Sequence, residues 1–227
     1  MNILAVETSS EACSCALLLA DGSLRQRYQL APREHTQLLL PMVDSLLEEA
    51  GLALGAVDCF AFGRGPGSFT GVRIAASAIQ GLALAVDRPV VGVSSLAALA
   101  AGSGKVGESV LAVFDARMGE VYLGAFHLDE RGLPNACQDE QLAAAETILL
   151  PDGGNWHGVG AGWPTHGQHL ARRLGQRLMS VAANQLPRAE YVARLADGPA
   201  RAGQGVDAEH ALPNYLRRDV ATARRAD

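Results

Sequence analysis

The chain has 227 residues, 48% of them hydrophobic, which is enough for one large domain or two small ones that share an interface. Its net charge of −5 argues against a protein that binds nucleic acid without a partner, because phosphate binding needs a basic face. No basic leader precedes Glu7, and no uncharged apolar run reaches the roughly 18 residues of a membrane span. We therefore expect a cytoplasmic protein with reduced cysteines.

The first part of the chain is predicted to alternate strands and helices. The predicted strands cover residues 3–6, 13–20, 24–30, 57–62 and 89–93. The first three form an antiparallel meander, in which Asp21-Gly22 is a hairpin turn. One helix ends at Gly51 and carries Pro41 either in its first turn or at a kink. A second, Ala-rich helix covers residues 74–86, and Ser94-Ser95 opens a third.

The chain then repeats its own plan. A Gly-rich stretch at 101–107 is the best domain boundary, and Leu111-Ala112-Val113 after it repeats Leu4-Ala5-Val6. In both copies an acidic turn, a second strand and a Gly-bearing hairpin follow in the same order. This pattern predicts two domains, residues 1–103 and 104–227, that face each other.

The rest of the second half carries weaker signals. A strand is predicted at 121–128 and a short one at 156–162. Helices are predicted at 141–150, 168–178 and 190–197, with a loop at 197–207. Residues 213–217 read as a short apolar anchor. The tail, with Arg217, Arg218, Arg224 and Arg225, is expected to be frayed from about residue 218.

A glycine-rich stretch at 63–73 joins a predicted strand to a helix. Gly65 and Gly67 allow a tight turn, and Ser68 or Thr70 could cap the helix. The loop could cradle an anion at the helix N-terminus, or it could only bring the helix close to the sheet. It is not a P-loop, because Val72 rather than a lysine follows its last glycine.

Two carboxylates, Glu7 and Asp115, each end the first strand of a repeat. Across a two-domain cleft they could face one another and hold a Mg²⁺-phosphate, or each could simply bind backbone N–H groups at a strand end. The first arrangement would suit an actin-like small-molecule kinase or ATPase. A peptidase would need a metal or an activated nucleophile, and Ser68 has no base that spacing assigns to it.

Five stretches together resemble the TsaB (YeaZ) family of bacteria: LAVETSS, REHTQLLLP, GRGPGSFTGVR, DARMGEVY and PNYLR. The resemblance covers essentially the whole chain. It implies an α/β, ASKHA (actin-like) fold with two subdomains. It also implies a role in making threonylcarbamoyladenosine at position 37 of tRNAs that read ANN codons. In that family the paralogue TsaD is the catalyst, TsaB is its non-catalytic partner, and the ATPase TsaE binds the pair.

One comparison with the catalytic paralogue favours the non-catalytic role. Its two metal-binding histidines fall on Ser95 and Leu99 when the strand at 89–93 is aligned. Leu99 cannot bind a metal, and Ser95 is a poor ligand for a transition metal. We therefore expect no catalytic residue, metal or cofactor. The expected remnant of a nucleotide cleft comprises Glu7, Thr8, Ser9, Gly65, Gly67, Ser68 and Asp115.

The resemblance also implies that the first two long helices form a bundle with the same pair in TsaD. The first helix offers an apolar stripe, and the second offers small residues that permit close approach. The predicted interface comprises Leu39, Val43, Leu46, Ala75, Ala78, Gly81, Leu82 and Ala85. A second copy of the chain is expected to bind there when the partner is missing. The tRNA is expected to be reached through the complex.

Overall fold

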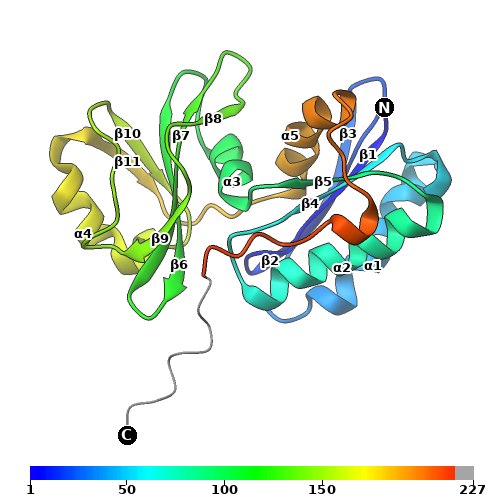
Figure 1. Cartoon of the computed structure of the whole chain (residues 1–227), viewed down its shortest axis with the longest axis horizontal. Coiled ribbons are helices and arrows are strands. Elements are labelled where there is room, and N and C mark those ends of the chain that lie inside the picture. The colour runs from blue at the N-terminus through cyan, green and yellow to red at the C-terminus, as the bar shows by residue number, and fades with distance from the viewer. Residues whose placement is uncertain (218–227) are drawn as a thin grey trace, which may run out of the picture.

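The computed structural model describes residues 1–217, which form two mixed β-sheets with helices on their faces (Figure 1). The first sheet contains β1 (Ile3–Glu7), β2 (Ala12–Leu18), β3 (Leu24–Leu30), β4 (Cys59–Gly63) and β5 (Val90–Val93). The second contains β6 (Ser109–Arg117), β7 (Glu120–Leu128), β8 (Pro134–Ala136), β9 (Gln141–Ala144), β10 (Trp156–Val159) and β11 (Leu178–Ala182).

The two sheets share one topology. The first has the order β3-β2-β1-β4-β5, and the second has the order β8-β7-β6-β10-β11, with β9 also paired to β7. In each sheet the first strand is antiparallel to the next strand in sequence and parallel to a later one. The predicted α/β class and the duplicated plan of mixed sheets with flanking helices are therefore confirmed.

Five α-helices surround the sheets in the described part of the chain. They are α1 (His35–Ala50), α2 (Phe69–Val86), α3 (Ser95–Ser103), α4 (Trp163–Leu174) and α5 (Ala189–Arg201). Three short 3₁₀ turns lie at Leu54–Ala56, Gly175–Arg177 and Ala208–His210. Helices α1 and α2 cover the outer face of the first sheet, and α4 covers the outer face of the second (Figure 1).

Helices α3 and α5 lie between the two sheets, and each crosses to the other half. Helix α3 follows the first sheet in sequence, but its Leu96 and Leu99 pack on the second. Helix α5 follows the second sheet, but its Val192 and Ala196 pack on the first. The assignment of all of residues 104–227 to a second domain therefore does not hold for α5, because its apolar face completes the core of the first half.

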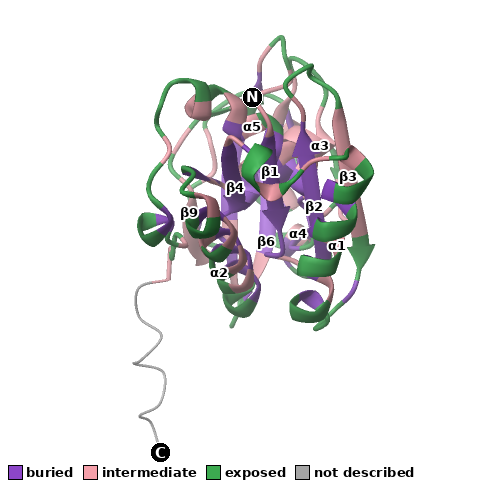
Figure 2. Cartoon of the chain, turned by 90° about the vertical axis from the view of Figure 1, so that its right-hand side faces the viewer, coloured by how far each residue is buried: buried purple, intermediate pink, exposed green. Residues whose placement is uncertain are grey.

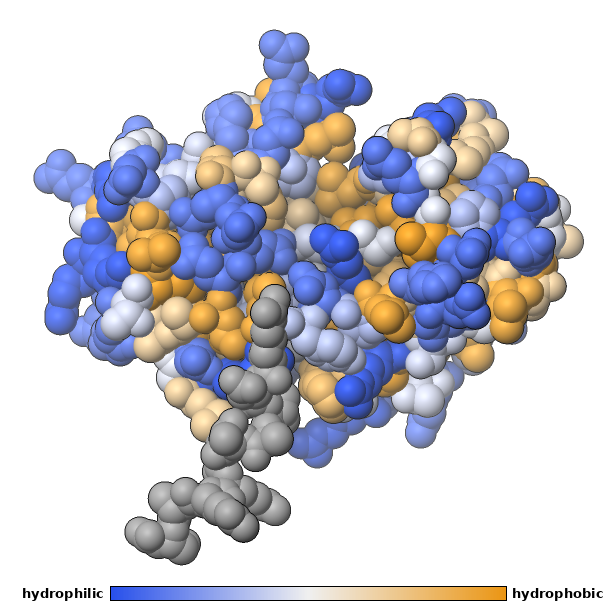
Figure 3. Space-filling model, viewed as in Figure 1, coloured by the Kyte–Doolittle hydropathy of each residue, from blue (hydrophilic) through white to orange (hydrophobic). Residues whose placement is uncertain are grey.

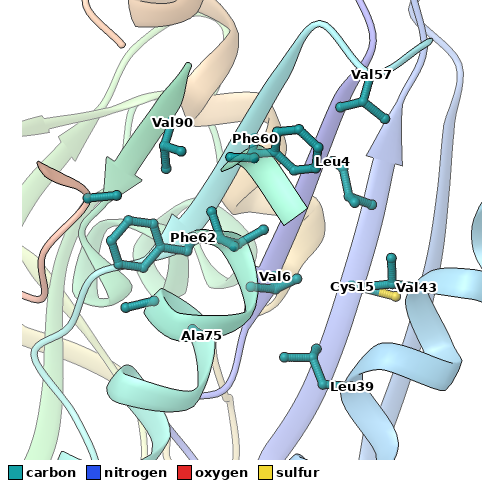
Figure 4. Close-up of a cluster of buried hydrophobic side chains, with 14 of the residues drawn as sticks. Leu4, Val6, Cys15, Leu39, Val43, Val57, Phe60, Phe62, Ala75 and Val90 are labelled. Carbon is teal, nitrogen blue, oxygen red and sulfur yellow. The ribbon is translucent and has the colours of Figure 1, made fainter. Parts of the chain in front are cut away.

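The core of the first half shows why α1 and α2 form where they do. Leu39 and Val43 of α1 and Ala75 of α2 point toward the strands, where they meet side chains such as Val6 and Phe62 (Figure 4). Figure 2 shows the central strands buried and the outward sides of these helices exposed. The helical spacing of apolar residues thus reflects burial against the chain's own sheet.

Several predicted elements differ in the structure. Helix α2 begins at Phe69 rather than at residue 74, after its N-cap Ser68. Residues 141–150 form strand β9 and a turn instead of a helix, because β7 needs a partner along its second edge. Helix α4 begins at Trp163 rather than 168, since Pro164 is tolerated in a first helical turn. Helix α5 continues to Arg201, through part of the predicted loop. Pro41 lies inside α1, beyond its first turn.

Helix α2 is long and apolar enough to cross a membrane by length and composition alone, with a mean hydropathy of 1.5 over 18 residues. Core helices meet the same criterion, and Ile79 and Ala83 of α2 are fully buried against the first sheet. On the face drawn in Figure 3, hydrophobic residues lie in separate patches among hydrophilic ones.

After α5 the chain returns along the first sheet, and its last described residue lies beside the second. Val206 makes an isolated antiparallel bridge to Val90, and the N–H of Asn214 donates to the Arg64 carbonyl over 2.8 Å. Arg217 then donates to Glu120 and to the Ala116 carbonyl, at the β6–β7 hairpin. We call residues 213–217 the C-terminal strap. The prediction that Arg217 belongs to a frayed tail is therefore wrong, because these contacts anchor it. The rest of the predicted tail, with Arg218, Arg224 and Arg225, lies outside the described residues.

Candidate functional site

The predicted nucleotide cleft is built on Glu7, at the end of β1. Its side chain is fully buried, and its carboxylate accepts from the Ser9 N–H over 2.6 Å and from the Ser95 hydroxyl over 2.8 Å. Gly63 lies against it, since a Cβ there would sit 1.9 Å from Oε2. Burial raises the pKa of Glu7 above its usual range, against the lowering effect of its hydrogen bonds. The predicted cleft carboxylate is therefore enclosed by its own subdomain.

Asp115 is held by a separate set of groups. Its Oδ1 lies 3.1 Å from His166 Nε2 and accepts from the Arg117 N–H over 2.9 Å. Burial opposes its ionisation, but the hydrogen bonds with His166 and Arg117 outweigh this effect and lower the pKa of Asp115. The His166 partnership is missed by sequence reasoning, because no motif links residues 51 positions apart.

Each of the two carboxylates is thus hydrogen-bonded to groups of its own half. Glu7 uses Ser9 and Ser95, and Asp115 uses His166 and Arg117. Among residues 1–217 no group of three or more His, Cys, Asp or Glu side chains is placed to hold a metal ion. Ser95 and Leu99 are both buried, the first hydrogen-bonded to Glu7 and the second packed in the core of the second half.

The glycine loop packs directly on the β1–β2 turn. Ser68 N–H donates to the Ser9 carbonyl over 2.7 Å, and Ser68 Oγ caps α2 by accepting from the Gly71 N–H. A Cβ on Gly67 would lie 2.6 Å from Ser9 atoms, and one on Gly71 would lie 2.0 Å from the Thr8 carbonyl oxygen. Thr8 Oγ1 also donates to the Gly71 carbonyl. Of the two predicted roles of this loop, close packing has a direct geometric basis.

The buried Glu7 carboxyl makes stability depend on pH. Because its pKa is raised on folding, the folded state binds more protons than the unfolded state above the ordinary value of 4.5. The free energy of unfolding should therefore fall as pH rises through the window between the two pKa values. Glu7→Gln should remove this slope, so that the stability of the variant relative to wild type rises with pH. Urea melts of both proteins from pH 5 to 8 measure this, and parallel pH profiles would contradict it.

The predicted partner interface is only partly at the surface. Leu39, Val43, Leu46 and Ala75 are at most 1% exposed, because they form the core beneath α1 and α2. Their assignment to an interface is therefore wrong, because these side chains face the sheet. Of the four, only Leu39 also borders the surface between the two helices. Ala78 and Leu82 are half-buried, and Gly81 and Ala85 are exposed.

A groove of about 500 Å³ lies between the outward sides of the two helices. We call it the α1–α2 groove. It is lined by Thr36, Leu39, Leu40, Phe69, Thr70, Arg73, Ile74, Ser77 and Ala78. Leu40 and Phe69 are about half exposed, at 48% and 51%. Sequence reasoning missed both, because they lie off the apolar stripes that helical spacing reveals.

Comparison with known proteins decides the family. A TsaB, the tRNA threonylcarbamoyladenosine biosynthesis protein of Escherichia coli K12, is 41% identical over 97% of this chain and 96% of its own length. The chain belongs to the TsaB (YeaZ) family. A Haemophilus influenzae TsaB is 38% identical over 97% of this chain and 95% of its own length. The family model for TsaD, tRNA N6-adenosine threonylcarbamoyltransferase, matches residues 29–221.

The fold agrees with a solved member of the family. YeaZ from Pseudomonas aeruginosa superposes with a TM-score of 0.87 at 46% identity, covering 95% of this chain and 99% of that one. The resemblance drawn from the sequence motifs is thus confirmed. The chain is a member of a family of tRNA threonylcarbamoyladenosine biosynthesis proteins, with the two-sheet α/β fold of that solved member.

Proposed function

We propose that this chain is the non-catalytic subunit of the complex that makes N6-threonylcarbamoyladenosine at position 37 of ANN-reading tRNAs. In this proposal it works in the cytoplasm, binds the catalytic paralogue TsaD, and TsaE binds the pair. The tRNA is contacted through the complex. The observation that supports it most is the enclosure of Glu7 by Ser9, Gly63 and Ser95, which removes the candidate nucleotide carboxylate from solvent.

The docking surface in this proposal is the α1–α2 groove. The buried apolar stripe of α1 is no longer part of the proposed surface. The surface consists instead of residues that a partner can reach, such as Leu40, Phe69 and Ala78. Exposed aromatic and aliphatic side chains beside a concave surface are typical of protein interfaces. The first subdomain, residues 1–103, carries this surface, and α5 supports it from the opposite face of the sheet. A second copy of the chain occupies the groove when TsaD is missing.

A test with the Ser68→Ala variant distinguishes this proposal from one in which the chain is itself a catalyst. Ser68 acts here as the N-cap of α2, so its loss should cost about 1 kcal/mol of stability and leave function intact. In cells depleted of the chain, mass spectrometry of tRNA nucleosides should show loss of the modification. Wild-type and Ser68→Ala chains should both restore it. A folded Ser68→Ala chain that fails to restore it would favour chemistry at Ser68, and modification that persists after depletion would refute the proposed role.

A further inference from the structure

The two halves of the chain touch along α3 and α5, and again at the C-terminal strap. Helix α3, which packs on the second sheet, contacts α5, which packs on the first. The approach is close, since a Cβ on Gly102 would lie 2.6 Å from the Tyr191 ring. At the start of α3 the Ser94 hydroxyl also donates to Glu140 of the second half. Figure 1 shows the strap (red) crossing separately from the side of α2 to β6.

The strap is held by the first half at several points. Ala211, just before it, is buried in the core of that half, and its carbonyl accepts from the Gln80 side chain over 3.2 Å. The Tyr215 hydroxyl accepts from Arg73 Nε–H of α2 over 2.8 Å. The Tyr215 ring also lies beside that of Phe69, with centroids 5.9 Å apart. The loss of any one of these contacts would therefore leave the strap attached to the first half.

The attachment to the second half is different, because it depends on one side chain. Within residues 1–217, Arg217 makes all the hydrogen bonds and ion pairs between the strap and the second half. Its guanidinium donates to the Ala116 carbonyl over 3.2 Å and to the Glu120 carboxylate. The Arg217 and Glu120 side chains are only 25% and 30% exposed, so water screens their attraction less than at an open surface.

The β6–β7 hairpin is shaped to receive this arginine. Its register shifts so that Asp115 lies opposite Val121 and Arg117 opposite Glu120, which leaves Ala116 without a partner on β7. An extra residue of this kind stands outside the ladder of backbone hydrogen bonds. Arg217 supplies a donor for its carbonyl. The hairpin thus offers one backbone oxygen and one carboxylate at the same place.

We propose that the C-terminal strap is a latch that fixes the angle between the two halves, and that Arg217 is its releasable end. When Arg217 leaves the hairpin, the strap stays on the first half and the second half rotates about the α3–α5 contact. The chain crosses between the halves at residue 94 and at 183–188, which lie outside the helices and strands. Interfaces between domains commonly permit such motion unless it is restrained. This inference goes beyond the proposed function, because it concerns the shape of the free chain.

The test is a distance measured between two spin labels on the full chain by pulsed electron paramagnetic resonance. Ser45→Cys on α1 and Arg172→Cys on α4 provide exposed labelling sites in the two halves, and Cys137→Ser removes the exposed native thiol. With Arg217 in place we expect one narrow distance distribution. Arg217→Gln should broaden the distribution and shift it to longer distances, because the second half is no longer held by the strap.

Three further variants locate the effect. Glu120→Ala removes the carboxylate from the other side of the latch and should shift the distribution in the same direction. Arg201→Gln is the matched control, since it breaks an arginine–carboxylate pair within α5 and should leave the distribution unchanged. Tyr215→Phe should also leave it unchanged, because the strap keeps its other anchors on the first half.

The latch is refuted if Arg217→Gln and Glu120→Ala both keep the wild-type distribution, since the α3–α5 contact would then set the angle alone. A shift with Arg201→Gln as well would point to a general response to lost charge and would also overturn it. Circular dichroism should show that every variant is folded, because none of the substituted side chains is fully buried. An unfolded Arg217→Gln chain would mean that the strap is part of the fold rather than a releasable latch.

Discussion

Replacing Gly71 with alanine should destabilise the fold by about 3 kcal/mol or more, near the upper end of the usual cost of overpacking. The added Cβ would lie 2.0 Å from the Thr8 carbonyl oxygen, a backbone atom that cannot turn away as a side chain can. Helix α2 would have to move off the β1–β2 turn, which would also break the bond from Thr8 Oγ1 to the Gly71 carbonyl. For a chain of this size we expect the melting temperature to fall by roughly 6–12 °C.

Gly81→Ala is the matched control, since it makes the same change on the same helix. Nothing lies within 4 Å of a Cβ at Gly81, which is exposed. Alanine there should stabilise α2 by about 0.5–1 kcal/mol through helix propensity. Thermal melts of the two variants measure the contrast. Equal stabilities would mean that the glycine loop does not set the distance between α2 and the sheet.

Ala78→Glu should weaken binding to TsaD at least about 100-fold, because it places a charge in an apolar contact at a cost of roughly 3 kcal/mol. Ala78 lines the α1–α2 groove and is half-buried in the free chain. A glutamate is a good helix former, and its carboxylate can reach solvent when no partner is bound. We therefore expect a folded protein with wild-type thermal stability and no measurable complex.

Leu149→Glu tests whether this loss is local. Leu149 is 71% exposed and lies after β9 in the second half of the chain, away from α1 and α2. The Leu149→Glu variant also replaces an apolar residue by glutamate, but it does so away from the α1–α2 groove. Its affinity for TsaD should therefore match that of wild type. If both variants lose the complex, the effect is a general response to added charge. If neither does, the docking surface lies elsewhere on the molecule.

The sequence predicted those parts of the fold that depend on local chemistry. Gly22 and Gly51 have positive φ in the hairpin and at the end of α1, as their positions suggested. The repeat around Leu4 and Leu111 correctly indicated two sheets of one topology, because the first strand of each occupies the same central place. These features need only a turn, a helix end or a short apolar run to be recognised.

Tertiary contacts explain the elements and residues whose structure or position was predicted wrongly from the sequence. The Ala-rich run at 141–150 has the composition of a helix, yet residues 141–144 pair with β7. The spacing of apolar residues located the buried stripe of α1. The same spacing does not show whether the stripe packs on the chain's own sheet or on a partner, and Leu39 and Val43 were therefore assigned to the wrong surface. The crossing of α5 and the meeting of Tyr215 with Arg73 join residues far apart in sequence, and no local pattern marks them.

A reconstituted tRNA modification assay tests the central claim most directly. Purified TsaD and TsaE, threonylcarbamoyl donor and tRNA are combined with no chain, with wild type or with Ala78→Glu. We predict that modification requires wild type in stoichiometric amounts, fails with Ala78→Glu, and does not occur with the chain alone. Full modification without the chain, or turnover by the chain in the absence of TsaD, would contradict the account.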